Sequence, residues 1–576
     1  MSPTVFFRFS LAVSLAATLS ACSGDDGDDG APGSQGEAGP AGPTGVNQTL
    51  IELRLIGSHQ PDADVFDESA AEIVAHDTIN QRLFVVNALA SSIDVLDISD
   101  PSQPSLINTI DATEEGADAN SVAVYEGTVA VAIEAEDTQA PGKVVFYNAL
   151  SLEKLAEAQV GALPDMVVFT RDGQKLLVAN EGEPSDDYLT DPEGSVSIIN
   201  LANGLDNLSV TTANFSAFEA DKEALMAQGL RIFGPNASLA QDLEPEYIAI
   251  SPDNTRAWVA LQENNAVAEL DLTSDQISAI VPLGFKNHQL LGNELDASNR
   301  DERINIRNWP IYGMYQPDSM ASYSFNGTTY YITANEGDAR DYDAWTEEFR
   351  IGDLRLNTEA FPDAAQLQAD DQLGRLLITS TLGVSNPDVC APSELRADVD
   401  AVEDHVENVC EYSSLFSYGA RSFSIWREDS QLMYDSGSEF EQITARRQPS
   451  YFNSNNDENS FESRSDDKGP EPEAVTVGRI NGQVFAFIGL ERVGGIMVYD
   501  VTNPQKPTFV QYLNNRDFTV SQEDLEAGLG GDLGPEGMAF IAGEDSPIDS
   551  PLLVVGNEVS GTTSIYAIDV IELGRE

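Results

Sequence analysis

Residues 473–513 read EAVTVGRINGQVFAFIGLERVGGIMVYDVTNPQKPTFVQYL and contain four short apolar runs separated by turns. The runs begin at Glu473, Val484, Ile496 and Thr508, and the fourth is the weakest. Short runs rich in Val, Ile and aromatic side chains, bounded by Gly, Asn or Pro, are typical of β-strands. The stretch therefore predicts a unit of four β-strands.

The same unit recurs along the chain. Its first strand is predicted at residues 72–75, 121–124, 165–168, 246–249, 318–321, 473–476 and 536–539. Seven copies predict an all-β fold, a seven-bladed β-propeller formed by residues 49–576. The seventh copy lacks a fourth strand. We expect residues 50–56, which alternate like a strand, to fill that place and close the ring from the N-terminal side.

Two long insertions interrupt the repeats, at about residues 338–418 inside blade five and about residues 439–470 after it. Loops of this length are usually functional or disordered. The first insertion contains Cys390 and Cys410, which we expect to form a disulfide in an oxidising compartment. A metal site or a nucleophile is the alternative, but the four histidines are scattered and show no metal-ligand spacing.

The N-terminal residues predict export and lipidation. Residues 1–21 resemble a signal peptide, and its end, Leu19-Ser20-Ala21-Cys22, resembles a bacterial lipobox. Cys22 is therefore the predicted lipidation site, and Ser23 after it is typical of an outer-membrane or cell-surface address. An ordinary secretory signal with a chance cysteine is the alternative.

Residues 22–48 carry a glycine at every third position from Gly24 to Gly45, which is the collagen period. We interpret this segment as a flexible, extended tether between the lipidated cysteine and the propeller. A short stalk that associates three chains is the alternative reading.

The chain is strongly acidic, with 96 Asp and Glu against 30 Lys and Arg and a net charge of −66. Such a charge repels phosphate backbones and argues against a nucleic-acid partner. It attracts divalent cations, which neutralise carboxylates held close together. Hydrophobic residues make up 41% of the chain, which is enough for a packed core.

Acidic residues recur at two equivalent positions of the repeats, the start of the first strand and the end of the second. These positions share one face of a propeller, near its central channel. We therefore expect a ring of carboxylates that binds calcium, since calcium accepts about six to eight oxygen ligands in irregular geometry. A solvated rim of charge is the alternative. The predicted ligands are Asp165, Glu181, Glu246, Glu336, Glu473, Glu491, Glu536 and Glu558.

Three arginines, Arg340, Arg421 and Arg492, lie close in sequence to these acids. A guanidinium pairs with phosphate through two hydrogen bonds, so the arginines are candidate contacts for an anionic or phosphorylated ligand. Salt bridges to the acidic ring are an equally good interpretation.

Several segments together resemble the choice-of-anchor I family of exported bacterial propellers, over about residues 50–570. Relatives in that family have been labelled alkaline phosphatase-like, and mesenchyme-specific cell-surface glycoproteins are similar. No serine nucleophile with the His and Asp cluster of a conventional alkaline phosphatase is apparent here. The segments that carry the resemblance lie at residues 180–184, 335–342, 419–426, 469–473 and 489–496.

Three functions follow as hypotheses: a surface-anchored binding module with calcium at its channel, a calcium-dependent phosphoesterase, or a purely structural protein. The scaffold supports the first two equally, because function depends on the site and not on the fold.

Overall fold

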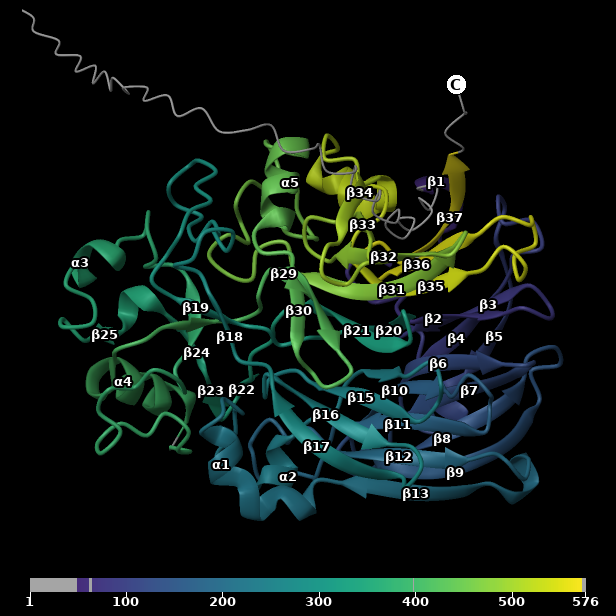
Figure 1. The fold of residues 1–576 in the computed structure, drawn as a ribbon, viewed down its shortest axis with the longest axis horizontal. Helices are drawn as coiled ribbons and strands as arrows, with labels where there is room; N and C mark the ends of the chain where they lie inside the picture. The colour runs from purple at the N-terminus through teal and green to yellow at the C-terminus, as the bar shows by residue number, and fades with distance from the viewer. Residues whose placement is uncertain (1–48, 62–64, 397, 572–576) are drawn as a thin grey trace, which may run out of the picture. The chain divides into compact units, whose positions relative to one another are not determined.

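The computed structural model describes residues 49–61, 65–396 and 398–571 (Figure 1). The predicted signal peptide, the lipidation site Cys22 and the tether 22–48 lie outside the described residues. The body is predominantly β-structure, as predicted. Among the described residues, no helix has the length and apolar character needed to cross a membrane.

Seven four-stranded antiparallel sheets dominate the described residues. Six are built from strands in chain order, and the first three of these are β2 (Val74–Asp77), β3 (Arg82–Asn87), β4 (Ser92–Asp97) and β5 (Ser105–Asp111); β6 (Ala119–Tyr125), β7 (Thr128–Ile133), β8 (Pro141–Asn148) and β9 (Lys154–Ala162); and β10 (Pro164–Phe169), β11 (Lys175–Asn180), β12 (Ser195–Asn200) and β13 (Ser209–Asn214).

The next three sheets follow the same order, although long segments separate some of their strands. They consist of β14 (Ile248–Ile250), β15 (Arg256–Leu261), β16 (Ala266–Asp271) and β17 (Gln276–Pro282); β20 (Met320–Phe325), β21 (Thr328–Asn335), β29 (Ser422–Arg427) and β30 (Leu432–Asp435); and β31 (Pro472–Ile480), β32 (Gln483–Leu490), β33 (Ile496–Asp500) and β34 (Thr508–Leu513).

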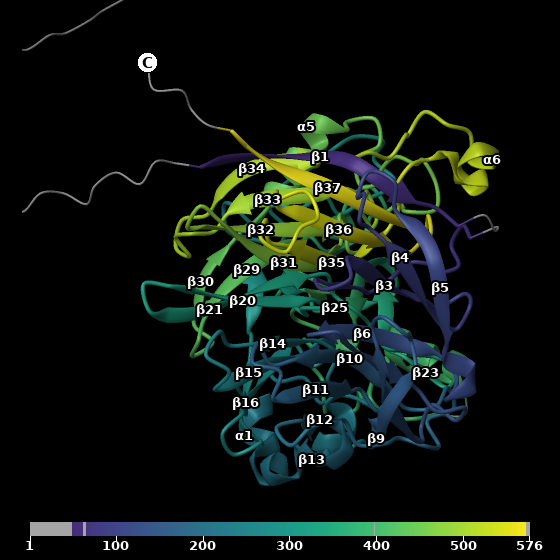
Figure 2. The same ribbon diagram turned by 90° about the vertical axis from the view of Figure 1, so that its right-hand side faces the viewer.

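The seventh sheet joins the two ends of the described chain. It contains β35 (Pro535–Ile541), β36 (Leu552–Asn557), β37 (Thr562–Ile571) and, as its fourth strand, β1 (Leu50–His59). Strand β1 is antiparallel to β37, with Leu50 opposite Ile571 and His59 opposite Thr563. Figure 2 shows the purple β1 lying along the yellow β37. The segment predicted to fill the missing place thus pairs where it was expected to.

The first strands of the sheets contact one another in a cycle. Strand β2 contacts β6, and the contacts continue through β10, β14, β20, β31 and β35 back to β2. The hydrophobic core lies between adjacent sheets; one cluster, for example, joins Phe84 and Ile93 to Val131 and Val145 of the next sheet. Second strands are buried on both faces, as in β32, whereas the fourth strand β5 is mostly exposed. This gradient explains why first to third strands are strongly apolar and fourth strands are weak in the sequence.

The insertion at residues 338–418 is folded, and its hydrophobic core is shared with residues from preceding segments of the chain. Trp345, Phe349, Ile378 and Tyr412 are buried in one cluster that also includes Trp309. Figure 1 shows the helices of this region on the left, away from most of the large sheets. Its elements and the preceding pair of strands are β18 (Phe285–Asn287), β19 (Tyr312–Met314), β22 (Asp341–Tyr342), β23 (Trp345–Thr346), β24 (Glu348–Arg350), β25 (Arg355–Leu356), α3 (Ala364–Leu367), β26 (Leu377–Thr379), α4 (Val399–Val409), β27 (Glu411–Tyr412) and β28 (Phe416–Ser417).

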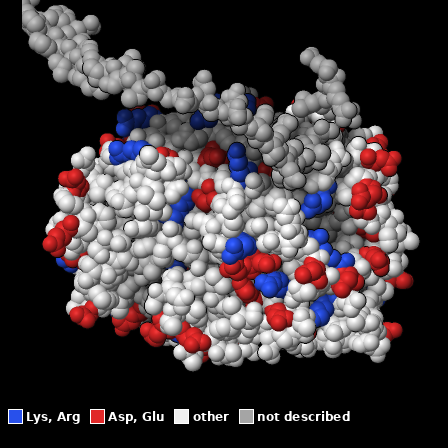
Figure 3. Space-filling model, viewed as in Figure 1, with Lys and Arg blue, Asp and Glu red and all other residues white. Residues whose placement is uncertain are grey.

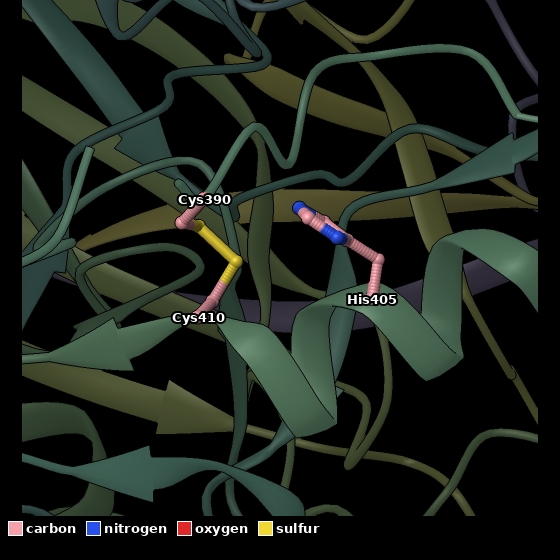
Figure 4. Close-up of side chains that lie close together, drawn as sticks. All are labelled: Cys390, His405 and Cys410. Atoms are coloured by element: carbon pink, nitrogen blue, oxygen red, sulfur yellow. A yellow bond between two sulfur atoms is a disulfide. The ribbon is translucent and has the colours of Figure 1, made fainter. Parts of the chain in front are cut away.

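The predicted disulfide between Cys390 and Cys410 is present in this insertion and is confirmed. His405 on α4 lies beside it (Figure 4), and its Nε2 accepts a hydrogen bond from the backbone N–H of Ala391 at 3.1 Å. Both sulfurs are consumed by the bond, so this group offers no thiolate to a metal. The bridge closes the loop that leads through α4.

The second insertion, at residues 439–470, begins with α5 (Glu439–Arg447) and continues as an ordered loop back to β31. The remaining helices are short: α1 (Lys222–Met226), α2 (Leu239–Asp242) and α6 (Gln522–Asp524).

Candidate functional site

Proline precedes the acidic residue at the start of five first strands. Proline has no N–H for a strand ladder, so it favours the start of a strand or a bulge. The pairing register shifts directly after Pro164, Pro472 and Pro535, and the acidic residue follows each of these prolines. Bulges turn a side chain out of the sheet's alternation. The five pairs are Pro164-Asp165, Pro245-Glu246, Pro317-Asp318, Pro472-Glu473 and Pro535-Glu536.

The acids of the second strands stand at equivalent places, one residue beyond each strand end. Glu181 follows β11, Glu336 follows β21, Glu491 follows β32, and Glu558 follows β36. At that point the ladder ends, and the side chain is free to leave the plane of the sheet.

All eight predicted ligands line one cavity of about 350 Å³, which we call the central cavity. Each of the seven sheets contributes residues from the start of its first strand or from the one or two residues before it. Asp318 and Asp338 add two further carboxylates. The eight acids share this cavity as the repeat alignment predicted. That they bind calcium stays a prediction.

Several carboxylate oxygens in this region have no partner. The Oε2 atoms of Glu246, Glu263, Glu473 and Glu536 are buried, and no described residue offers them a hydrogen bond. Unpaired buried carboxylates are costly unless they are protonated or meet a cation.

The crowding of these acids shows in their pKa values. Burial raises the pKa of Asp165 to about 7, and the charge of Glu183 adds to the effect. Burial, followed by the charges of Glu263 and Glu181, raises the pKa of Glu246 well above its ordinary value. Burial, followed by the charge of Glu491, raises the pKa of Glu473 well above its ordinary value.

One side of the central cavity contains basic groups. Lys468, from the second insertion, lies 2.5 Å from Glu336 and 3.2 Å from Glu471. Arg492 lies 3.1 Å from Glu471 and 2.9 Å from Glu491. Burial alone would raise the pKa of Glu471, but Lys468 and the neighbouring arginines outweigh it and lower this pKa to about 2.

The three predicted ligand-binding arginines are all engaged in ion pairs. Arg492 lines the central cavity, but Arg340 and Arg421 are not among its lining residues. Arg340 is buried against Asp242 at 2.8 Å and Glu244 at 2.6 Å. Arg421 is buried against Glu441 at 2.6 Å. The alternative interpretation, salt bridging, describes what these side chains do here, and a role toward a ligand stays a prediction.

Besides Asp318 and Asp338, three residues near the site are absent from the predicted set: Glu263, Glu471 and Lys468. Glu263 is one residue beyond the second-strand position held by Gln262, and Glu471 lies two residues before Glu473. The recurring Pro-acid pair was a signal for the first-strand positions, whereas Lys468 lies in an aperiodic loop. Figure 3 shows acidic and basic side chains gathered side by side on one face as well.

The family model described as Choice-of-anchor I domain matches residues 72–504. Gigasin-3a of Magallana gigas is 33% identical over 166 residues, covering 27% of this chain and 58% of that protein. The mesenchyme-specific cell surface glycoprotein of Strongylocentrotus purpuratus is 27% identical over 341 residues, covering 52% of this chain and 42% of that protein. The chain thus spans about half the length of these curated relatives.

Two solved structures show a distant likeness to this chain. The Cps50 (Swd1) β-propeller domain of Myceliophteria thermophila is 7% identical, with a TM-score of 0.41 over 89% of this chain and 100% of that one. The hydrazine synthase of Kuenenia stuttgartiensis is 11% identical, with a TM-score of 0.41 over 88% of this chain and 97% of that one.

Proposed function

Because the chain belongs to the choice-of-anchor I domain family, we propose that it is an exported, surface-associated β-propeller lipoprotein that acts as a calcium-dependent binding module. The observation that carries this proposal is the convergence of eight carboxylates on one cavity. Nearby, four buried carboxylate oxygens lack a partner among the described residues. Calcium suits the cavity better than magnesium, which keeps its waters and demands octahedral geometry.

The proposed architecture is a closed seven-bladed propeller. Its support is the set of seven four-stranded sheets, the cyclic contacts of their first strands, and the pairing of β1 with β37. Such closure hides sheet edges that would otherwise remain unpaired.

The proposed location is the outer membrane or the cell surface. It rests on the lipobox-like sequence ending at Cys22, on the tether 22–48, and on the family. The name of the sea-urchin relative likewise places that protein at a cell surface. Trimerisation through the glycine repeat is the alternative to a simple tether, and the size of the purified full chain tests it.

Calcium binding is testable by calorimetric titration of chelator-stripped protein with CaCl₂ and, separately, with MgCl₂. We expect saturable binding of calcium, weaker binding of magnesium, and a higher melting temperature in calcium. At a free calcium concentration of about 100 times the dissociation constant, the gain should be about 2.7 kcal/mol. Absence of calcium binding would contradict the proposal.

A calcium-dependent phosphoesterase is the second candidate. The observation that favours it is the presence of Lys468 and Arg492 in the same cavity as the carboxylates. Metal ions activate water, and basic groups stabilise the charge of a phosphoryl group. Hydrolysis of p-nitrophenyl phosphate that depends on calcium and is lost in Glu246→Gln would favour this function. Calcium binding without turnover would favour the binding module.

A further inference from the structure

The acids in and around the central cavity form two groups of three. In each group, one oxygen from every glutamate lies within 4.8 Å of the others, the spacing that a single metal ion requires. The first group is Glu181, Glu246 and Glu263; the second is Glu336, Glu471 and Glu491. We call them the open triad and the paired triad.

The paired triad already has its counter-ions. Glu336 and Glu471 contact Lys468, and Glu491 contacts Arg492. Arg464 contacts Glu471 as well, at 2.8 Å. Arg464 is shared with Asp467, at 2.7 Å. Each of the three carboxylates of the paired triad therefore has at least one basic partner without a metal.

The open triad has none. Among the ion pairs of the described residues, none includes Glu181, Glu246 or Glu263. Glu263 is only 3% exposed, and its Oε2 atom has no hydrogen-bond partner. The Oε2 atom of Glu246 is also buried and unpartnered. Three carboxyl groups thus converge where no described basic side chain forms an ion pair with any of them.

Two arginines hold the backbone of the open triad and of the residues just before it. Arg231 donates a hydrogen bond to the carbonyl oxygen of Glu263 at 2.5 Å. Arg340 binds Asp242 and Glu244, which directly precede Pro245 and Glu246. In known metal sites, contacts made to a ligand residue or to its neighbours orient that ligand toward the metal. They give Arg340 a positioning role that differs from the ligand contact expected from sequence.

We propose that one calcium ion binds to the open triad, and that the ammonium group of Lys468 stands in for a second cation at the paired triad. This inference rests on the proposed function and assigns its ligands. Three carboxylates leave several calcium positions to waters or to oxygen atoms of a bound ligand, since calcium takes about six to eight oxygens. The ion would therefore present an open coordination side to an anionic ligand in the central cavity.

The test is calorimetric titration of the chelator-stripped full chain with CaCl₂. We expect one ion for each chain. Glu263→Gln keeps the side-chain shape but removes one charge, and should weaken binding roughly tenfold or more. The matched control is Glu223→Gln, at an exposed glutamate of α1, which should bind calcium as the wild type does.

A gain of one saturable site provides the second arm, because misfolding would give diffuse binding and not a second site of defined stoichiometry. Lys468→Met removes the ammonium from the paired triad, and a second, weaker calcium site should appear. If Lys468→Met still binds one ion, the counter-ion role is wrong. If the wild type binds calcium and Glu263→Gln binds it equally well, the assignment to the open triad is wrong while the proposed function stands. If the wild type binds none, the proposed function itself fails.

Discussion

Lys468 Nζ lies 2.5 Å from Oε1 of Glu336, although the two residues are 132 positions apart in the chain. Both side chains are largely buried, and their contact joins the second insertion to the end of β21.

Replacing Lys468 with Met in chelator should destabilise the protein by about 3 kcal/mol, because it leaves the largely buried carboxylate of Glu336 without its ion-pair partner. Denaturant unfolding measures the change. The double variant with Glu336→Gln should recover part of the loss, with a coupling of at least about 1 kcal/mol. If the changes in the free energy of unfolding of the two single variants simply add up in the double variant, the contact contributes nothing to stability.

A chain that begins at residue 60 should be less stable than one that begins at residue 49. The shorter chain loses β1, which buries Ile51 and Leu53 and covers the edge of β37. Burial of two such side chains alone is worth roughly 3 kcal/mol or more. Equal melting temperatures of the two chains would show that β1 is dispensable.

Cys22→Ser should move the protein from the membrane fraction to the soluble fraction of the producing cells, because acyl chains at Cys22 are the proposed anchor. Immunoblotting of the two fractions measures this. Ser23→Ala, at the next residue, should still be lipidated. Retention of Cys22→Ser in the membrane would contradict lipid anchoring.

Replacing Cys390 and Cys410 with Ser should loosen the first insertion and leave the central cavity intact. A bridge over a separation of 20 residues contributes about 3 kcal/mol on the chain-entropy model. Hydrogen exchange should therefore accelerate in α4 and its neighbours, while calcium affinity stays at the wild-type value. Loss of calcium binding in this variant would mean that the insertion supports the site directly.

Stability should fall as the pH rises toward about 8. Burial and the charge of Glu441 raise the pKa of Asp296 from 3.8 to about 7. Burial and the charge of Asp296 raise the pKa of Glu462 from 4.5 to about 8. Between the ordinary pKa and the raised pKa of each group, the folded protein holds a proton that the unfolded chain has released. The free energy of unfolding therefore decreases as the pH rises through this interval.

Glu462→Gln cannot ionise and isolates one part of this effect. The melting temperature of this variant minus that of the wild type should increase from about pH 5 to about pH 8. Below about pH 4 the two melting temperatures should differ least. A difference that does not change with pH would mean that Glu462 is already ionised in the folded protein.

The sequence predicted the strands and the convergence of the acids because both repeat. Equivalent positions in a repeated unit lie at equivalent places in space, so Asp165, Glu246 and Glu473 could be assigned together. Periodicity says nothing about the insertions, and Lys468 reaches the central cavity through one of them. Arg340 shows what sequence proximity does not reveal: it follows Glu336 closely in sequence, yet its side chain pairs with Asp242 and Glu244. Such long-range ion pairs depend on packing that local sequence does not encode.

The pairing of β1 with β37 also has a mechanical consequence. A force applied to the chain before Leu50 acts first on the hydrogen bonds between these two strands, since Leu50 opposite Ile571 is the outermost pair. If the protein is anchored through its N-terminal side while its cavity binds a ligand, the pulling force acts on the hydrogen bonds between β1 and β37. Their strength would then set the tension at which the sheets begin to come apart.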